Sequence, residues 1–353
     1  MAKSVYTKRN IKYRNYLING DMNIAQRGTS FPAIASAAYS LDRFKYSNSS
    51  AAVHTAAQNS DVPTFSQSSY LFQNSMLLTL TTVDASIAAG DQVNVQQAVE
   101  GFNFINLAQK VFTLSFWVKA TLPGTYCVSF RNSGLDRSYV AEYTINATDT
   151  WEYKTITVSA SPAAGTWTYG TGSGLIVSWQ LACGSTFQTT AGAWQTGNFL
   201  GTSNQVNGVN TLLTATNFRL TGVMLNEGPE ALPFRLFDDS GTSDLVPCQR
   251  YYEKTYDLDV APGTNPGGGA GREGISITNL VQTNWDFKVK KRSTPSMVAY
   301  SSNSGASGVW TTNVQTPTAS FSTIGTTGVS IRGTGTITAG NVFNVHATAE
   351  AEL

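Results

Sequence analysis

The sequence has little charge. Only 13% of its 353 residues are Asp, Glu, Lys or Arg, about half of the ~25% found in ordinary globular proteins. The formal net charge is +1 at pH 7, so no overall field attracts the chain to nucleic acid or to an anionic membrane. We therefore expect neither of these partners. A polar but uncharged composition favours a many-stranded protein of an extracellular or virion setting.

Cysteine and long apolar runs are scarce as well. Cys127, Cys183 and Cys248 are too far apart for metal or redox motifs, and their odd number argues against a disulfide framework. The first 20 residues lack the apolar segment of a signal peptide. No run reaches the roughly 18–20 apolar residues of a membrane span. We expect three small buried thiols in a soluble chain that is made in a cytoplasm.

Catalytic and cofactor motifs are also missing. His54 and His346 lie far apart in the chain, and no metalloprotease, nucleophile-elbow or P-loop spacing occurs. Residues 269–274 match the dinucleotide fingerprint by letter, but they lie in a Gly/Pro-rich loop and not between a strand and a helix. A glycosidase needs two facing carboxylates, and acids such as Glu142 and Glu152 cannot be paired from sequence. We expect no enzymatic activity, no cofactor and no metal.

What the sequence does contain is a repeated alternation of apolar and polar residues. In residues 111–118 every second side chain is apolar, which is the period of a half-buried strand. Gly, Asn and Pro turns separate several such runs, so we predict an all-β protein with a jelly-roll β-sandwich over residues 17–247. The best helix candidate spans 244–254, with Asp244 as its cap. The other strand-like runs are 151–158, 174–181 and 217–225.

Two further parts flank the predicted sandwich. Residues 1–16 hold five basic residues and no acid, and form either a flexible start or an arm that docks on an acidic partner surface. Residues 248–353 contain more strand-like runs around a Gly/Pro-rich loop at 261–274. We predict a smaller C-terminal β domain there.

Aromatic residues are plentiful, with 7 Trp, 15 Tyr and 17 Phe. An exposed ring can bind a sugar because the C–H face of a pyranose packs on it while Asn, Gln, Ser and Thr bond the hydroxyls. Trp167 and Tyr169 lie between Gly165 and Gly170, and Trp194 lies between Gly192 and Gly197, in loop-like contexts. Trp310 lies in a loop-like context as well. We predict these four as glycan-binding residues, with Trp194 the strongest candidate. The alternative is that each ring anchors a core or a subunit interface.

Five motifs follow one another along the chain. They are NYLINGDMNIAQRGTSF at 15–31 with YSLDRF at 39–44, LSFWVKA at 114–120, LTGVMLNEG at 220–228, PCQRYYEK at 247–254, and RSTP at 292–295 with the terminal AEAEL. Together they resemble a family of bacteriophage tail-fibre and related virion proteins, whose opening reads N-x-L-I-N-G-D-F-x-I-x-Q-R-G before a Y-x-x-D-R-W box. Met22 and Phe44 replace two aromatic residues of that pattern. The middle motifs resemble jelly-roll carbohydrate-binding modules.

The polar residues of the opening motif have their own interpretation. Gln26, Arg27, Asp42 and Arg43 stand beside apolar strand ends. We predict that they form a hydrogen-bonded or ion-paired structural cluster that fixes the N-terminal strands, and not a ligand site. The resemblance itself assigns no binding residue and no catalytic residue.

The resemblance implies a virion protein with a sugar-binding architecture. We expect a tail fibre that binds a host-surface glycan as a homotrimer, because weak sugar sites gain avidity when they are linked. The N-terminal arm would attach it to other virion proteins. Two alternatives stay open: a head fibre or capsid decoration protein built from the same modules, and a polysaccharide depolymerase.

Overall fold

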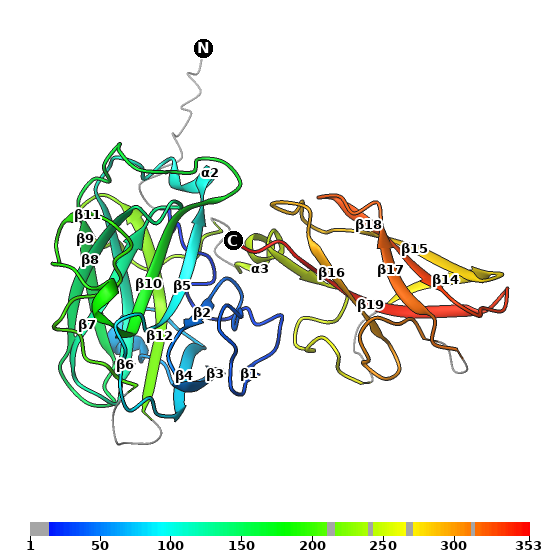
Figure 1. Ribbon diagram of the computed structural model, residues 1–353, viewed down its shortest axis with the longest axis horizontal. Helices are drawn as coiled ribbons and strands as arrows, with labels where there is room; N and C mark the ends of the chain where they lie inside the picture. Colours follow the sequence, from blue (N-terminus) through cyan, green and yellow to red (C-terminus); the bar gives the residue numbers. More distant parts are fainter. Residues whose placement is uncertain (1–13, 210–215, 239–242, 266–270, 312–314) are drawn as a thin grey trace, which may run out of the picture. The chain divides into compact units, whose positions relative to one another are not determined.

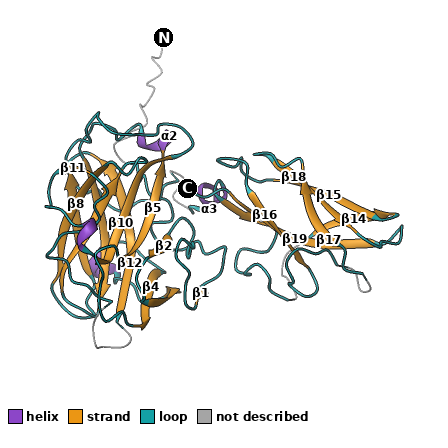
Figure 2. Ribbon diagram, in the orientation of Figure 1, coloured by secondary structure: helices purple, strands orange, loops and turns teal. Residues whose placement is uncertain are grey.

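The computed structural model describes residues 14–209, 216–238, 243–265, 271–311 and 315–353. Most of the predicted arm at 1–16 and the centre of the loop at 261–274 lie outside the described residues. The described chain is almost entirely strand and loop, as Figure 2 shows. The predicted all-β class is confirmed: a jelly-roll β-sandwich is followed by a smaller β domain. None of the described helices is long and apolar enough to cross a membrane.

The chain divides into two compact units. The first comprises residues 1–23, 32–39 and 44–244, and the second comprises 24–31, 40–43 and 245–353. We predicted the boundary between the sandwich and the C-terminal domain at residues 247 and 248. Two early segments, 24–31 and 40–43, also group with the C-terminal part. They contact Tyr251, Tyr252 and Glu352, which are remote in sequence.

Two six-stranded sheets form the sandwich (Figure 1). Sheet A has the order β1 (Ser30–Phe31), β3 (Val53–Asn59), β4 (Ser75–Thr82), β12 (Asn217–Glu227), β6 (Phe112–Ala120) and β9 (Glu152–Val158). Sheet B has the order β11 (Trp194–Thr196), β8 (Arg137–Ile145), β7 (Gly124–Arg131), β10 (Ser173–Cys183), β5 (Gln92–Glu100) and β2 (Lys45–Asn48). All the paired strands described in these sheets are antiparallel.

The core of the sandwich lies between these sheets. It is formed by the apolar side chains that alternate with polar ones along the strands. On β6 the alternate apolar residues of the 111–118 run are fully buried. Phe116 meets Trp179 of β10 edge-on with ring centroids 5.9 Å apart, and Phe112 meets Phe130 of β7 at 5.5 Å. Burying each such side chain stabilises the fold by roughly 1.5–3 kcal/mol. The alternation in the sequence therefore identified the inner face of β6.

The outer face of sheet B is also largely covered. Ser129, Ser178 and Gln180 point outward in register, yet they are buried. The connection 184–207, which leads from β10 through η2 (Ser185–Phe187) and β11, passes over this face. The Gly192 amide donates to the Val140 carbonyl, and the Phe199 amide donates to the Ser138 hydroxyl. This long connection positions the surface features of the next section.

Helices are few and short: α1 (Phe65–Ser68), α2 (Gly101–Phe104) and α3 (Leu245–Gln249). The predicted helix at 244–254 is present only in its first part, because β13 (Tyr252–Lys254) follows it at once. Asp244 stands directly before α3. Its carboxylate accepts the amides of Asn19, Phe237 and Asp238, and so ties the turn at Asn19 to the segment that leads into α3.

The second unit is built on one sheet. Its order is β13, β19 (Val342–Glu350), β14 (Arg272–Ile277), β15 (Leu280–Asp286), β18 (Gly328–Thr334) and β17 (Thr318–Ser322), and β16 (Ser296–Ser301) also pairs with β19. A core of buried apolar side chains centres on Trp285, Trp310 and Phe343. The three cysteines of the chain are buried thiols that form no disulfide with one another, as expected. Burial raises the pKa of the Cys127 thiol to about 11.

Candidate glycan-binding surface

Five aromatic residues of the first unit form one cluster, which we call the edge cluster: Phe104, Tyr139, Trp167, Tyr169 and Trp194. Trp167 and Trp194 meet edge-on, with ring centroids 5.7 Å apart. Phe104 stacks on Trp167 at 5.2 Å and on Tyr169 at 6.2 Å. Tyr139 contacts Trp194 at 5.7 Å. Three of the four predicted sugar-binding residues, which are distant from each other in the sequence, are thus brought together.

Strand pairing and backbone hydrogen bonds position the two tryptophans. Trp194 opens β11 at the edge of sheet B and pairs directly with Tyr139 of β8, so both side chains lie on the same face. The indole N–H of Trp194 donates to the carbonyl of Ser159, just after β9, at 2.9 Å. The indole N–H of Trp167 donates to the Ala164 carbonyl at 3.1 Å. Trp194 therefore links the edges of the two sheets, which Figure 1 shows beside one another.

The loop that carries Trp167 and Tyr169 is held at both ends. Asp136 accepts hydrogen bonds from the Asn132 amide, from the Thr166 amide and from the Thr166 hydroxyl. The bond from Asn132, with those from Thr166, lowers the pKa of Asp136 below its ordinary value. At the other end the Gly101 amide donates to the Gly172 carbonyl, and a Cβ at Gly101 would lie 2.5 Å from the Thr168 carbonyl oxygen. Only glycine permits this close approach.

The edge cluster is graded in exposure. Phe104 is fully buried, and Tyr139 is nearly so. Trp167 and Trp194 are half-buried, whereas Tyr169 is 38% exposed. The buried rings hold the outer rings in place, and a ligand can reach the outer rings from solvent. This is the arrangement that a preformed stacking surface requires.

The prediction for Trp310 is wrong. Trp310 is fully buried in the core of the second unit, where it packs with Val281 and Phe343. Gly274 and Gly333, which are distant from Trp310 in the sequence, leave room for its ring, because a Cβ at either position would come within 3.2 or 3.0 Å of that ring. A ring enclosed in this way cannot stack on a ligand.

The four polar residues of the opening motif also lie together. Gln26 donates to Asp42 from its backbone amide at 2.9 Å and from its side chain at 2.5 Å. Arg27 lies 3.1 Å from the Glu352 carboxylate, which also pairs with Arg43. All of these residues belong to the second unit. Burial raises the pKa of Asp42 to about 6 even though Arg27 opposes the shift.

Aromatic stacking supports Arg27 and Arg43. The guanidinium of Arg43 lies 3.5 Å from the centre of the Tyr251 ring, and that of Arg27 lies 3.8 Å from the centre of the Tyr252 ring. These contacts join the opening motif to the PCQRYYEK motif and to the AEAEL terminus. The cluster therefore consists of charged groups that are paired within the fold.

A polar groove lies on the outer face of sheet B, near the edge cluster. We call it the Glu142 groove; its volume is about 660 Å³. Glu142 lies on β8, and the other lining residues belong to the connection 184–207. From the sequence, Glu142 was only an acid without an assigned partner, and the groove was not predicted. The run of Gln, Thr, Ser and Asn in that connection is the feature that could have indicated a polar groove. The lining residues are Glu142, Gln188, Thr189, Thr190, Ala191, Thr202, Ser203 and Asn204.

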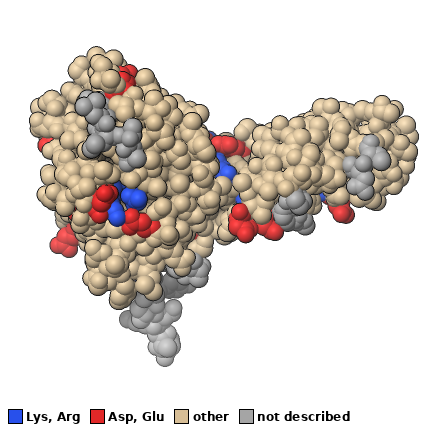
Figure 3. Space-filling view, turned by 90° about the horizontal axis from the view of Figure 1, so that it is seen from below, with Lys and Arg blue, Asp and Glu red and all other residues tan. Residues whose placement is uncertain are grey.

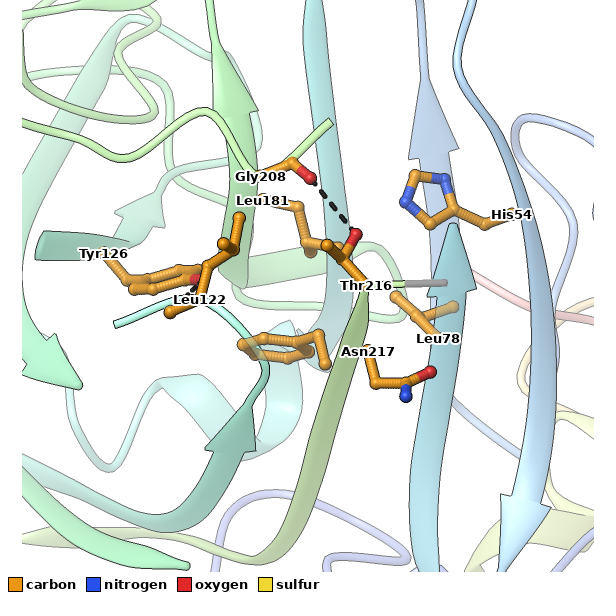
Figure 4. A pocket seen from close by; sticks show the side chains of 9 residues that line it. His54, Leu78, Leu122, Tyr126, Leu181, Gly208, Thr216 and Asn217 are labelled. Atoms are coloured by element: carbon orange, nitrogen blue, oxygen red, sulfur yellow. Dashed lines mark hydrogen bonds between the residues drawn. The ribbon is translucent and has the colours of Figure 1, made fainter. Parts of the chain in front are cut away.

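A small cavity between the two sheets is a weaker candidate. Figure 4 shows its lining, which includes His54, Leu78 and Tyr126. Its volume of about 20 Å³ is about that of a single water molecule. His54 bonds to the Tyr46 hydroxyl at 2.8 Å, and burial lowers its pKa to about 4. We interpret His54 as a neutral packing residue. Among the residues that the structure describes, no group of three acidic, His or Cys side chains could hold a metal ion.

No protein-family model and no curated protein matches the chain. Among solved structures, the enzymatically active domain of bacteriophage CBA120 tailspike protein 4 is similar over 62% of this chain and 22% of its own, with a TM-score of 0.35 and 15% identity. A family 4 carbohydrate-binding module is similar over 60% of this chain and 98% of its own, with a TM-score of 0.31 and 16% identity. A family 11 module of a Clostridium thermocellum cellulase is similar over 57% of this chain and 97% of its own, with a TM-score of 0.31 and 9% identity.

Proposed function

We propose that the first unit binds a glycan at the edge cluster, and that the chain is a bacteriophage tail fibre that attaches the particle to a host-surface glycan. The observation that carries the binding proposal is the convergence of Trp167, Tyr169 and Trp194 into one graded, partly exposed surface. Aromatic faces of this kind supply large contact area at low entropic cost.

The surface composition supports the same proposal. Figure 3 shows a face on which charged atoms gather in a few places and most of the surface is uncharged. Such a surface is hydrated through hydroxyl and amide groups, which are also the groups that hydrogen-bond sugars. The virion role rests on the resemblance of the five motifs to tail-fibre proteins. The basic arm would provide the attachment to other virion proteins.

A pair of matched substitutions tests the binding site. Tyr169→Ala removes a ring that is 38% exposed, so we expect roughly tenfold weaker glycan binding, about 1.4 kcal/mol, with little change in melting temperature. The measurement is titration calorimetry with the strongest binder from an array of bacterial surface polysaccharides. Tyr153→Ala is the control, because Tyr153 is 44% exposed and lies beside Trp117 on the outer face of sheet A. Equal losses from both variants would contradict the assignment.

The location on the particle is tested separately. Immunogold labelling of the intact phage should place this protein on tail fibres or at the tail tip. Gold over the head would instead support the head-fibre or decoration role, for which the basic arm would be the attachment. We also propose that the chain binds without cleaving, so incubation with the bound polysaccharide should release no new reducing ends.

The proposed homotrimer has a direct test. Light scattering during size-exclusion chromatography should give about three times the 37.8 kDa of one chain. Three linked weak sites give tight attachment through effective concentration. A stable monomer would contradict the trimer and leave the binding site itself unaffected.

A further inference from the structure

The Glu142 groove has fixed walls. Residues 188–191 and 202–204 run side by side, joined by the bridge between Gln188 and Gly201 and by a hydrogen bond of 3.0 Å from the Thr189 amide to the Gly201 carbonyl. The side-chain amide of Gln188 donates to the Cys183 carbonyl at the end of β10. The walls are therefore tied to each other and to sheet B. A ligand would meet a groove that is already formed.

The carboxylate of Glu142 is oriented by the groove itself. Its Oε1 accepts hydrogen bonds from the Thr202 hydroxyl at 2.5 Å and from the Asn204 amide at 3.0 Å. Thr202 is buried, whereas Glu142 is exposed. Within the described chain, no hydrogen bond or ion pair uses Oε2. One oxygen thus holds the carboxylate in position, and the other is available to a donor from solvent.

The lining contains this one carboxylate and no Lys or Arg. Its remaining polar groups are hydroxyls and amides, which carry no charge. A carboxylate without a neighbouring cation binds groups that donate hydrogen bonds, and such charge-assisted bonds are about twice as strong as neutral ones. It repels a ligand carboxylate, sulfate or phosphate. The ligand chemistry that fits is therefore a hydroxyl-rich group without negative charge.

The groove lies close to the edge cluster. Tyr139 and Glu142 are three residues apart on β8, a distance of about 10 Å along the strand, and their side chains project to opposite faces of sheet B. Ala191 of the groove and Trp194 of the cluster belong to the same short segment, which the Gly192–Val140 hydrogen bond fixes over β8. A glycan held by the rings can pass the sheet edge at β11 and enter the groove.

We propose that the Glu142 groove is a second subsite that binds a neutral sugar residue through its hydroxyl groups, and that it selects neutral glycans over acidic ones. This proposal rests on the proposed glycan-binding function and specifies its substrate class. Glu142 would accept hydrogen bonds from sugar hydroxyls at Oε2. The groups at Thr189, Ser203 and Asn204 would complete the contacts.

The test uses the full chain and matched polymer pairs. Galactan, mannan and glucan are compared by titration calorimetry with polygalacturonate, polymannuronate and polyglucuronate, which differ from them by a carboxylate on each sugar. We expect the best neutral polymer to bind at least tenfold more tightly than its acidic counterpart. Glu142→Gln retains an acceptor for Thr202 and Asn204 but removes the charge. We expect this variant to bind the neutral polymer about tenfold more weakly and to narrow the gap between the two polymers.

Glu230→Gln is the control, because it removes the same charge from an exposed position of the first unit outside the groove. It should leave both affinities unchanged. If Tyr169→Ala weakens binding and Glu142→Gln does not, or if the acidic polymers bind as tightly as the neutral ones, the groove proposal is wrong and the edge cluster stands. If Glu142→Gln weakens binding and Tyr169→Ala does not, the groove stands and the edge cluster is wrong. A panel in which no polymer binds overturns both.

Discussion

Two surfaces of the first unit each present a tyrosine beside a tryptophan. In the edge cluster, Tyr169 is 38% exposed and lies near Trp167 through their shared neighbour Phe104. On the outer face of sheet A, Tyr153 is 44% exposed and its ring centroid lies 5.3 Å from that of Trp117. Aromatic exposure alone does not distinguish these two surfaces.

Their polar surroundings do distinguish them. Next to Trp117 on the face of sheet A, the Lys119 ammonium lies 2.7 Å from the Asp61 carboxylate, and the Arg219 guanidinium lies 3.3 Å from it. These charges are already paired with one another. Beside the edge cluster, the Glu142 groove offers hydroxyls, amides and one carboxylate oxygen that other groups leave available. A sugar site needs available hydrogen-bonding groups next to its ring, which is why our proposal concerns the edge cluster and not the face of sheet A.

Trp194→Ala should produce the largest change. Trp194 is half-buried, contacts Tyr139 and Trp167, and donates to the Ser159 carbonyl. Its loss should destabilise the first unit by about 2–3 kcal/mol, below the roughly 3–5 kcal/mol of a fully buried Trp, and should also abolish glycan binding. Thermal unfolding and calorimetry measure the two effects. Trp194→Phe keeps a ring and should recover much of the stability; equal damage from both variants would contradict a stacking role.

Trp117→Ala gives the smaller, contrasting result. Trp117 packs against Tyr153 and against the bulge at Gly222, where a Cβ would come within 2.9 Å of the indole. We expect a loss of about 1–2 kcal/mol in the free energy of unfolding and an unchanged glycan affinity. Denaturant unfolding and calorimetry on the same preparation check both. Weakened binding in a folded Trp117→Ala variant would move the site to sheet A.

The sequence revealed the strands more completely than the site. The alternation in residues 111–118 identified the inner face of β6 because burial on one side of a sheet imposes a period of two. Loop-like contexts led to Trp167, Tyr169 and Trp194, yet the same feature was wrong for Trp310. The Trp310 ring is buried in a core beside Gly274 and Gly333, which are distant from it in the sequence. Only tertiary structure brings these glycines to the ring.

Contacts between residues far apart in the sequence were the second feature that could not be predicted. Arg27 and Arg43 were predicted to join a polar cluster, but their partner Glu352 lies at the other end of the sequence. The Glu142 groove needs β8 and a connection some 50 residues later to meet over one face of a sheet. No local pattern encodes such a meeting, because it depends on the order of strands in the sheet.

The smallest expected effect concerns Asp61, the centre of the charge group on sheet A. Burial raises the pKa of Asp61, but hydrogen bonds from Lys119 and from the Trp151 indole outweigh it and hold the pKa below its ordinary value. A lowered pKa in the folded state means that this contribution to stability is complete above the unfolded value near 4. It is lost as the pH falls through the folded value.

Solvent and salt screen this partly exposed group, so the Asp61 contribution should stay below about 1 kcal/mol. Asp61→Asn should lower the melting temperature slightly at pH 7, and the difference from the unsubstituted chain should shrink as the pH falls below 4. Added salt should shrink it as well. Glycan binding at pH 7 should not change, because the Asp61 charges are paired away from the edge cluster. A loss of binding in Asp61→Asn would mean that the ion-paired face of sheet A contacts the ligand, and the contrast between the two aromatic surfaces would be reversed.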